Sequence, residues 1–335
     1  MSTSSPWEGQ TVLVTGAGGF IGSHLVERLV AEGARVKAFV RYTSSSELGL
    51  LSMLASDALS SVDVVRGDLR DPAAVVDAMD GCECVFHLGA LIAIPYSYIH
   101  PREVVDTNVI GTLNVLEAAR KTKPRRVVHT STSEVYGTAR AASISESHPL
   151  QGQSPYSASK IAADKLAESY QCSFGVPIAT VRPFNTYGPR QSARAIIPTI
   201  VTQALRLSHV KIGATTPTRD FTFVSDTVAG FLAAATAPSD DVVGRAINLG
   251  TAQEISIGEL ARCIMQIVGR DLELICEEQR FRPKQSEVHR LRSDNGLAKQ
   301  LLGWSPAIGL AEGLRTTIDW IRDNLEMYRV GPYEV

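Results

Sequence analysis

The stretch Thr11-Val-Leu-Val-Thr-Gly16-Ala-Gly-Gly19-Phe-Ile-Gly22 decides the fold of this chain. An apolar run predicts a strand, three spaced glycines predict a turn, and an apolar period from 20 to 31 predicts a helix. Gly16 permits a tight turn, Gly19 lets backbone approach a pyrophosphate, and Gly22 lets the helix pack closely on the strand. Because a helix N-terminus attracts phosphate, the stretch predicts a dinucleotide-binding site rather than an ordinary glycine-rich turn.

A second pattern lies downstream, where Tyr156 and Lys160 stand four residues apart in a predicted helix over 154–174. Residues at i and i+4 share a helix face, so we expect the ammonium beside the phenol. The pKa of a free phenol is about 10, and a nearby positive charge favours the phenolate. We therefore predict that Tyr156 accepts a proton in catalysis. The plainer alternative is an aromatic residue and a lysine on an amphipathic helix.

Length and composition bound the class of protein. The 335 residues can bury a sizeable core, and the net charge of −2 gives no indication of nucleic acid or a membrane surface as partner. No apolar run approaches the ~18 residues of a membrane span, and the N-terminus lacks the regions of a signal peptide, so we expect a cytoplasmic protein. The five cysteines include no C-x-x-C pair, which predicts no metal site and reduced, buried thiols.

Strands alternate with helices through the first half of the chain, which predicts an α/β fold with a Rossmann-type, doubly wound parallel sheet. The expected strands are 11–15, 35–40, 62–66, 84–87, 126–130 and 177–182, and the expected helices are 20–31, 72–79, 102–121 and 154–174. We assign residues 1–182 to this dinucleotide-binding domain and 183–335 to a smaller C-terminal α/β lobe, with an interleaved boundary. The lobe is expected to contain strands 210–212, 221–224 and 246–249 and helices 197–206, 226–236 and 257–268. A substrate cleft between the two parts is the expected geometry.

The glycine turn, with its G-x-x-G-x-x-G spacing, Asp68-Leu69, the Tyr156/Lys160 pair and Asn185-Thr-Tyr-Gly-Pro-Arg190 form a specific set. Together they resemble the extended short-chain dehydrogenase/reductases that act on nucleotide sugars. The resemblance covers the chain from 11 to about 320. It implies a bound NAD or NADP, a nucleotide-sugar substrate and a homodimer that pairs through helices 102–121 and 154–174.

The run Ser131-Thr132-Ser133-Glu134-Val-Tyr-Gly137 decides the subclass that the resemblance implies. Sugar-nucleotide 4,6-dehydratases typically have Thr-Asp-Glu here, with the aspartate as acid and the glutamate as base, and simple 4-epimerases usually have no glutamate. UDP-glucuronate decarboxylases share the Ser-Glu version, as do the N-acetylglucosamine-nucleotide 4,6-dehydratases of legionaminic-acid biosynthesis. Stretches 90–98, 129–138, 148–156, 182–194 and 216–220 look most like the second group.

The resemblance thus favours a 4,6-dehydratase that acts on a GDP- or UDP-linked N-acetylglucosamine. The alternatives are UDP-glucuronate decarboxylase, a nucleotide-sugar 4-epimerase, another dehydratase regiochemistry and a non-catalytic dinucleotide-binding sensor. The sequence leaves the nucleobase open.

The resemblance also implies a role for each residue of the catalytic set. Tyr156 would take the proton from the sugar O4, while Lys160 lowers the pKa of the phenol and binds the nicotinamide ribose. Thr132 would hydrogen-bond O4, and Glu134 would remove the C5 proton. Ser133 is too weak an acid to replace an aspartic acid, so either it positions a water or Glu134 carries its captured proton to the departing oxygen.

The expected cofactor contacts come from the glycine turn and from the ends of the following strands. They are Gly16, Gly19, Phe20, Ile21, Gly22, Arg41, Asp68, Leu69, Leu88, Gly89, Ala90 and Asn108, beside Tyr156 and Lys160. NAD-specific folds place an acid after the second strand to bind the ribose 2′-hydroxyl, but this chain reads Phe39-Val-Arg41-Tyr-Thr-Ser44. Since Arg41 could accept a 2′-phosphate, we slightly favour NADP over NAD.

The expected substrate contacts are polar groups that match nucleotide- and diphosphate-binding positions of the family. Arginine suits phosphate because its planar fork binds two oxygens. The set is Tyr96, Thr132, Asn185, Arg190, Arg194, Arg219 and Arg282, with Arg292 as a weaker candidate.

Overall fold

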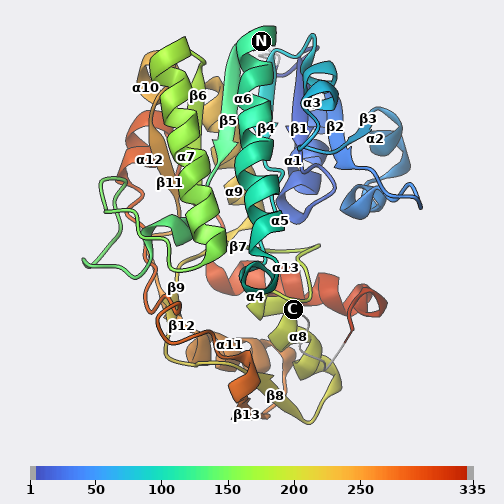
Figure 1. Ribbon diagram of the computed structural model, residues 1–335. Helices are drawn as coiled ribbons and strands as arrows, with labels where there is room; N and C mark the ends of the chain where they lie inside the picture. Colours follow the sequence, from blue (N-terminus) through green and yellow to red (C-terminus); the bar gives the residue numbers. More distant parts are fainter. Residues whose placement is uncertain (1–4, 330–335) are drawn as a thin grey trace.

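The computed structural model describes residues 5–329 and is built around one parallel, seven-stranded sheet (Figure 1). The strand order is β11-β6-β5-β4-β1-β2-β3, and every neighbouring pair is parallel. This confirms the predicted fold class. The order reverses at β1, and ligands of doubly wound sheets bind beside the carboxyl ends of the strands at such a point. The strands are β1 (Thr11–Thr15), β2 (Arg35–Arg41), β3 (Asp63–Gly67), β4 (Cys84–His87), β5 (Arg126–Thr130), β6 (Ile178–Pro183) and β11 (Ala246–Leu249).

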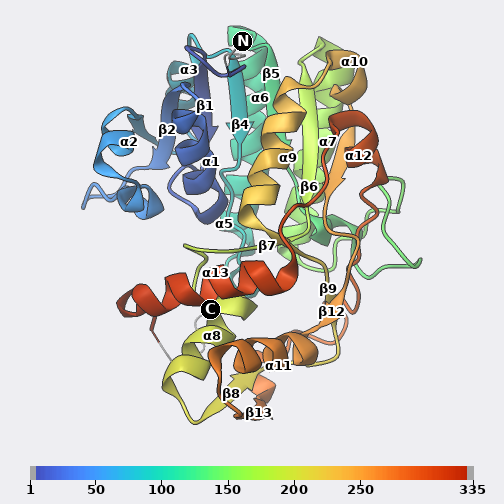
Figure 2. The same cartoon turned by 180° about the vertical axis from the view of Figure 1, so that it is seen from behind.

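Helices cover both faces of the sheet. Figure 1 shows α6 (Gly111–Thr122) and α7 (Pro155–Phe174) in front of it, with α3 (Pro72–Met79) beside them. Figure 2 shows α1 (Phe20–Ala31) and α9 (Val224–Thr236) on the opposite face, together with α12 (Gly296–Leu302). Because both faces are covered, the strands have buried apolar centres, and most of their charged residues lie near the strand ends.

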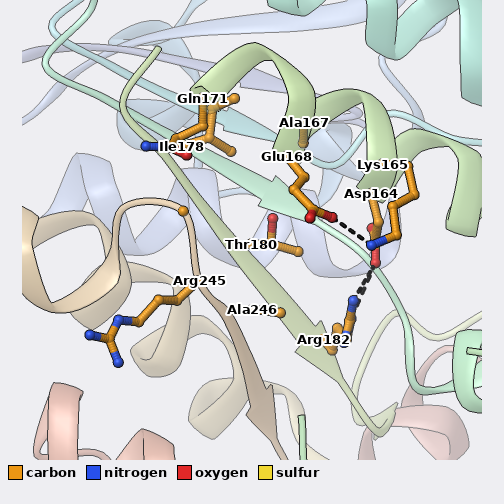
Figure 3. A pocket seen from close by; sticks show the side chains of 11 residues that line it. Asp164, Lys165, Ala167, Glu168, Gln171, Ile178, Thr180, Arg182, Arg245 and Ala246 are labelled. Carbon is orange, nitrogen blue, oxygen red and sulfur yellow. Dashed lines mark hydrogen bonds and ion pairs between the residues drawn. The ribbon is translucent and has the colours of Figure 1, made fainter. Parts of the chain in front are cut away.

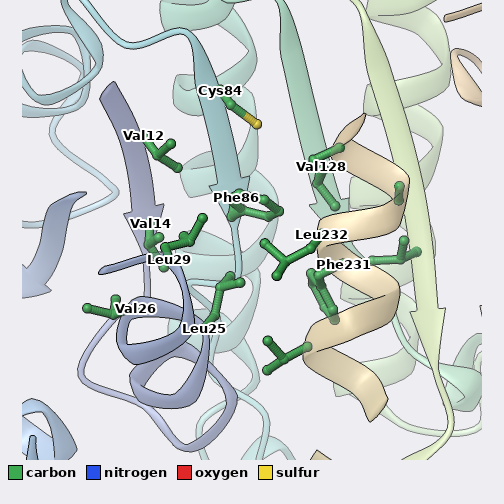
Figure 4. Close-up of a cluster of buried hydrophobic side chains, with 14 of the residues drawn as sticks. Val12, Val14, Leu25, Val26, Leu29, Cys84, Phe86, Val128, Phe231 and Leu232 are labelled. Atoms are coloured by element: carbon green, nitrogen blue, oxygen red, sulfur yellow. The ribbon is translucent and has the colours of Figure 1, made fainter. Parts of the chain in front are cut away.

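The core between the sheet and the α1/α9 face is close-packed (Figure 4). Leu25 and Leu29 of α1 and Phe231 and Leu232 of α9 lie in one buried cluster with Phe86 of β4. The two helices also pack against each other, although about 200 residues separate them in the sequence. The second half of the chain therefore completes the core of the first.

This arrangement corrects one part of the predicted division. We expected 226–236 and 246–249 in the smaller lobe, but α9 packs on the main sheet and β11 pairs with β6 as its edge strand. The reason is burial: Phe231 and Leu249 fill the core that the first six strands leave open on that face. Periodicity along the chain cannot show that a later segment packs back onto the first sheet. The boundary between the two predicted domains, at 182/183, stays a prediction. The outer ends of these domains, residues 1–4 and 330–335, lie outside the described residues.

The smaller lobe has its own apolar core and lies at the carboxyl ends of the sheet strands. Phe20, the first residue of α1, packs against that core. Figure 1 shows the lobe below the sheet. It consists of α8 (Ile196–Arg206), α11 (Ile257–Val268), α13 (Leu310–Asp323) and the strand pairs β7 (Asn185–Tyr187) with β10 (Phe221–Phe223), β8 (His209–Ile212) with β13 (Glu273–Cys276), and β9 (Thr218–Arg219) with β12 (Ile255–Ser256).

The predicted helix 102–121 is interrupted. The structure has α5 (Pro101–Val105), a π-helical turn over Asp106–Ile110, and then α6. Asn108 lies in that turn, buried, where its amide donates to Leu91 O at 2.9 Å and to Ser159 Oγ at 3.0 Å. Such turns are frequent at functional sites, and the apolar period alone gives no sign of the extra residue.

Short elements complete the described chain. They are the helices α2 (Ser56–Ser60), α4 (Ile94–Ile99) and α10 (Ser239–Val242) and the 3₁₀ turns Gly49–Met53, Ser133–Tyr136, Glu278–Arg280 and Leu325–Met327. Within residues 5–329, no helix has the length and apolar character needed to cross a membrane.

Gly22→Ala is expected to destabilise the protein by about 1–3 kcal/mol, the usual cost of forcing an extra methyl into packed structure. A Cβ at Gly22 would lie 2.2 Å from the carbonyl oxygen of Gly16, which is backbone and can move only with the whole turn. Urea denaturation measures the free energy of unfolding. Gly309→Ala is the control, because nothing lies within 4 Å of its Cβ, and its cost should stay below about 1 kcal/mol. Equal losses in both variants would contradict the close approach at Gly22.

Candidate active site

The loops after β1 and β4 meet at the carboxyl edge of the sheet. The backbone N–H of Leu88 donates to Thr15 O at 3.2 Å, and that of Gly89 donates to Thr15 Oγ1 at 3.1 Å. Gly16 has a φ of +69°, and a Cβ there would lie 2.8 Å from Gly89 Cα. Only glycine suits both conditions. The two loops therefore lie in direct backbone contact at the switch point of the sheet.

The beginning of α1 suits an anionic group. Its N-cap residue Gly19 provides no side-chain hydrogen bond, and the first helical turn contains no acid. The N–H groups of this turn are therefore left for an external acceptor, and the helix dipole favours a negative one. Phe20, Ile21 and Gly22 belong to this turn. These residues fit the pyrophosphate of NAD or NADP.

Other predicted cofactor residues lie around these loops. The Leu69 side chain packs against Gly89, where a Cβ would lie 2.6 Å from Leu69 Cδ1. Ala90 follows in the same loop and is half-buried. Asp68 is paired with Arg70 at 2.6 Å, and this hydrogen bond lowers the pKa of the Asp68 carboxyl.

Two of these residues have surroundings that the sequence did not indicate. The Asn108 Oδ1 also accepts the N–H of Leu91 at 2.8 Å, beside the two bonds that its amide nitrogen donates. These contacts show that Asn108 holds the loop after β4. Arg41 is the last residue of β2, its side chain is 65% exposed, and its Nη2 lies 4.0 Å from Glu103 Oε1.

Tyr156 and Lys160 are placed by the first turns of α7. Ser154 caps the helix by accepting the N–H of Ser157, and Pro155 occupies its first position. This register buries both side chains against the sheet. The Lys160 ammonium donates to Thr130 O at 2.7 Å, which holds it at the carboxyl end of β5.

The charges around this pair correct one expectation. Burial raises the pKa of Tyr156; a hydrogen bond with Thr132 opposes the rise and the carboxylate of Glu134 adds to it. Burial also lowers the pKa of Lys160 to about 8, against the opposing charge of Asp164. The predicted lowering of the phenol pKa by Lys160 is therefore wrong for the protein alone, because desolvation dominates.

The segment after β5 brings the remaining predicted catalytic residues together. Thr132 caps the 3₁₀ turn Ser133–Tyr136 by accepting the N–H of Glu134 at 3.2 Å, and Ser133 is buried. The Glu134 side chain is 13% exposed, and its charge acts on the Tyr156 hydroxyl. A phenol, a hydroxyl and a carboxylate thus converge at the end of β5.

Two predicted arginines approach this site from the smaller lobe. Arg282 Nη1 lies 3.8 Å from Glu134 Oε1, and the buried Arg219 pairs with Glu287 at 3.2 Å. Asn185 is nearby, because its amide donates to Asp220 O, one residue after Arg219. Glu287 was not predicted from the sequence, because no spacing pattern marks it.

The other predicted substrate residues lie elsewhere. Arg190, with a φ of +67°, pairs with Glu27 of α1 at 2.9 Å, because its loop folds back onto that helix. Tyr96 hydrogen-bonds Glu103, since α4 packs on α5, and it lies beside Arg41. Arg194 is exposed, and Arg292 donates to Ala252 O at 2.9 Å. The structure does not bring these four together with Arg219 and Arg282.

Asp164, one turn beyond Lys160, is a buried polar residue that was also not among the predicted site residues. It accepts from Ser131 Oγ at 2.8 Å and from Arg182 Nη2 at 2.9 Å, and His129 Nε2 lies 3.1 Å from its other oxygen. Although burial opposes ionisation, the hydrogen bond from His129 and the neighbouring charges lower the pKa of Asp164 to about 2. It follows Lys160 by four residues, as Lys160 follows Tyr156, and this repeated spacing was a usable signal.

A separate cavity lies between α7 and the strands β6 and β11 (Figure 3). Arg182 and Asp164 face each other on its wall, and Lys165 pairs with Glu168 at its rim. Its volume is about 70 Å³, whereas pockets for small molecules usually hold ~300–1,000 Å³. The cavity is too small for a nucleotide sugar.

Potential metal ligands do not cluster within the described residues, 5–329. No group of three or more His, Cys, Asp or Glu side chains in this part of the chain could hold a metal ion. The cysteines Cys82, Cys84, Cys172, Cys263 and Cys276 are all free thiols.

Comparisons with known proteins agree with this geometry. The profile of the family described as GDP-mannose 4,6 dehydratase matches residues 13–317. A UDP-glucose 4-epimerase of Mycolicibacterium smegmatis is 36% identical over 93% of this chain and 98% of its own, and UDP-glucuronic acid decarboxylase 1 of Xenopus tropicalis is 31% identical over 94% and 73%. The structure of a dTDP-glucose 4,6-dehydratase from Streptomyces venezuelae, solved with NAD bound, superposes with a TM-score of 0.86 at 28% identity, covering 95% of this chain and 99% of its own. The chain therefore belongs to the extended short-chain dehydrogenase/reductases, in the family of nucleotide-sugar epimerases, dehydratases and decarboxylases.

Proposed function

We propose that this protein is a nucleotide-sugar 4,6-dehydratase that converts a GDP- or UDP-linked N-acetylglucosamine to its 4-keto-6-deoxy form. One observation carries the proposal: the carboxyl end of β5, where Thr130 O holds the Lys160 ammonium at 2.7 Å, also places the Glu134 carboxylate, only 13% exposed, near the Tyr156 phenol. A proton acceptor for O4 and a second base are then available to one sugar ring. Dehydration across C5 and C6 needs that second base, whereas epimerisation at C4 does not.

The chain's own groups would divide the work as follows. Tyr156 accepts the O4 proton, Thr132 hydrogen-bonds O4, and the Lys160 ammonium, fixed on Thr130 O, lies in the same buried region. NAD or NADP, when bound, supplies the hydride acceptor for C4, the positive charge of the oxidised nicotinamide and the hydride that returns to C6. Glu134 removes the C5 proton, which the new 4-ketone makes acidic. When hydride returns to C6, C5 takes a proton from solvent and Tyr156 releases the O4 proton, so the sugar loses one water and the redox change sums to zero.

Ser133 cannot protonate the departing hydroxide as an aspartic acid would. It is buried, and its hydroxyl has no acidic character near neutral pH. We infer that Glu134 itself returns the captured C5 proton to the C6 oxygen. One carboxylate can serve as base and then as acid when both atoms lie on the same face of the sugar.

The same serine favours a second candidate, UDP-glucuronate decarboxylase. After oxidation at C4, carbon dioxide leaves from C5 without a proton donor for a departing oxygen, so a missing acid is no obstacle. The Xenopus decarboxylase shows that the family includes this chemistry. A 4-epimerase would use Tyr156 and Lys160, but its reaction would not require Glu134. A dinucleotide sensor would require none of these three residues.

Product masses test the proposal. The enzyme is incubated with UDP- and GDP-N-acetylglucosamine, UDP-glucose and UDP-glucuronate, and each product is weighed by mass spectrometry. Loss of water from an N-acetylglucosamine nucleotide supports the dehydratase. Loss of carbon dioxide from UDP-glucuronate, or a new sugar of unchanged mass, replaces it with the decarboxylase or the epimerase.

We also propose NADP as the preferred cofactor, supported by Arg41 and by the lack of an acid at the end of β2. Arg41→Ala should weaken NADP binding roughly 10- to 150-fold, because a charge-assisted contact is worth about 1.5–3 kcal/mol. NAD binding should change less than about twofold. Titration calorimetry measures both dissociation constants. Equal effects on the two cofactors would make Arg41 a surface residue and NAD the cofactor.

For the quaternary structure we propose a homodimer that pairs through the helical segment 101–122 and α7. Two large apolar side chains of that segment, Val105 and Ile110, are more than one-third exposed. Phe174, at the end of α7, is exposed as well. Sedimentation equilibrium measures the mass in solution.

A further inference from the structure

Four charged side chains meet where the smaller lobe faces the end of β5. Arg219 Nη2 lies 3.2 Å from Glu287 Oε1, and Arg282 Nη1 lies 3.8 Å from Glu134 Oε1 and 4.0 Å from Glu287 Oε1. The exposed fractions of the side chains are 8% for Arg219, 15% for Glu287 and 28% for Arg282. The two positive charges are thus matched by two carboxylates of the chain itself, in a region with little solvent screening.

The pairing is incomplete at Arg282. Its Nη1 is buried without a hydrogen-bond partner, because both carboxylates lie beyond hydrogen-bond distance. Arg219, in contrast, donates to Glu287 and to Thr218 O at 2.9 Å. A guanidinium binds two oxygens of a phosphate in parallel. A diphosphate can therefore satisfy the two arginines better than Glu287 does.

The backbone around Glu287 is anchored, so exchange of partners requires only the side chain to move. The Gln153 amide donates to Gln285 O at 3.1 Å and to Glu287 O at 3.3 Å. Ser286 Oγ donates to Gln153 O and lies 2.6 Å from the Tyr98 hydroxyl. These contacts tie the segment 285–287 to α4 and to the loop before α7.

We propose that Glu287 is an internal counter-ion of the substrate site. Its carboxylate holds Arg219 and Arg282 in the free enzyme, and the diphosphate of the nucleotide sugar replaces it. The inference rests on the proposed function only for the diphosphate group, which dehydratase, decarboxylase and epimerase substrates share. Part of the free energy of diphosphate binding is therefore spent on breaking the ion pairs that Glu287 makes with the two arginines.

The exchange also affects the candidate base. Arg282 lies between Glu287 and Glu134, so a diphosphate that binds Arg282 draws it away from Glu134. Binding of the diphosphate therefore separates the Glu134 carboxylate from the Arg282 guanidinium.

Glu287→Gln tests the counter-ion, because the amide keeps the shape and removes the charge. UDP, GDP and inorganic pyrophosphate are titrated calorimetrically into the cofactor-loaded enzyme. Each diphosphate that binds the wild type should bind the variant about tenfold tighter, which corresponds to about 1.4 kcal/mol. KM for the sugar nucleotide should fall with no rise in kcat. Glu287→Asp, which keeps the charge, should restore wild-type affinity.

Glu277→Gln is the matched control. Glu277 lies in the same lobe and pairs with Arg280 at 2.6 Å and with Lys211 at 3.6 Å, outside the four-charge cluster. Its loss should leave diphosphate affinity unchanged. Unchanged or weaker binding in Glu287→Gln overturns the proposal. Weaker UDP or GDP binding beside tighter pyrophosphate binding overturns it too, because it would show that Glu287 binds the nucleoside.

The test separates this inference from the proposed function. Tighter diphosphate binding in Glu287→Gln, together with no loss of water from any sugar nucleotide, would support the counter-ion and reject the dehydratase. Wild-type enzyme that binds neither UDP, GDP nor pyrophosphate would reject the counter-ion as well, since Arg219 and Arg282 would then not form a diphosphate site.

Discussion

Tyr156→Phe is expected to lower kcat by about 10²–10⁴-fold, the usual contribution of a positioned proton acceptor. The phenyl ring fills the same buried space, so the fold and dinucleotide binding should persist. What disappears is the group that takes the O4 proton, and without that step no hydride leaves C4. Steady-state kinetics measures kcat, and a titration of the same sample measures the dissociation constant of the cofactor.

Tyr170→Phe is the control for Tyr156→Phe. Tyr170 lies on the same helix, is buried to a similar extent, and hydrogen-bonds Glu117 far from Glu134. The kcat of the Tyr170→Phe variant should equal that of the wild type. If Tyr156→Phe keeps more than about a tenth of wild-type kcat, the oxidoreductive account of this site is wrong.

Glu134→Gln should separate oxidation from dehydration. Oxidation at C4 needs Tyr156 and Lys160 but no base at C5, so the variant should still reduce its bound cofactor, visible as nicotinamide absorbance. It should then stall, with product formation reduced about 10²–10⁴-fold, because an amide cannot take the C5 proton. In deuterated water, wild-type product should contain solvent deuterium at C5, whereas the variant should yield almost none.

Glu168→Gln provides the comparison for Glu134→Gln. Glu168 is an exposed acid of α7, paired with Lys165, and its loss should change neither step. Normal product release by Glu134→Gln would assign the base elsewhere. The proposal of a dehydratase would then lose its main support, which is the position of Glu134 in the site.

The fold was predictable where local pattern and packing agree. The strands of the first half lie within one or two residues of their predicted ends, because short Val-rich runs buried on both faces leave few alternatives. The pattern failed for α9 and β11, whose apolar faces suit either lobe equally well. Their position is fixed by contacts with α1 and β6, which are distant in sequence. The π-helical turn at Asn108 could not be predicted from the sequence either. It depends on the hydrogen bonds of a buried amide and not on the spacing of apolar residues.

The site divides in the same way. Spacing along the sequence predicted the turn at Gly16 and the helices that contain Gly22, Tyr156 and Lys160, because these distances are local; their roles in the site stay predictions. Contacts between lobes were not predictable from spacing. Arg190 resembles a substrate residue by sequence, yet its loop folds back onto α1, where Glu27 is the nearest acid. The pKa of Tyr156 was misjudged for a related reason, since i,i+4 geometry shows proximity but not the depth of burial.

Transfer of the C4 hydrogen tests the central claim most directly. A UDP- or GDP-N-acetylglucosamine labelled with deuterium at C4 is converted by the wild-type enzyme, and the product is examined by mass spectrometry and NMR. A 4,6-dehydratase should give a product lighter by one water that contains the deuterium in its C6 methyl group, because hydride taken from C4 returns to C6. Deuterium found again at C4, in a sugar of unchanged mass or one that has lost carbon dioxide, would contradict the dehydratase.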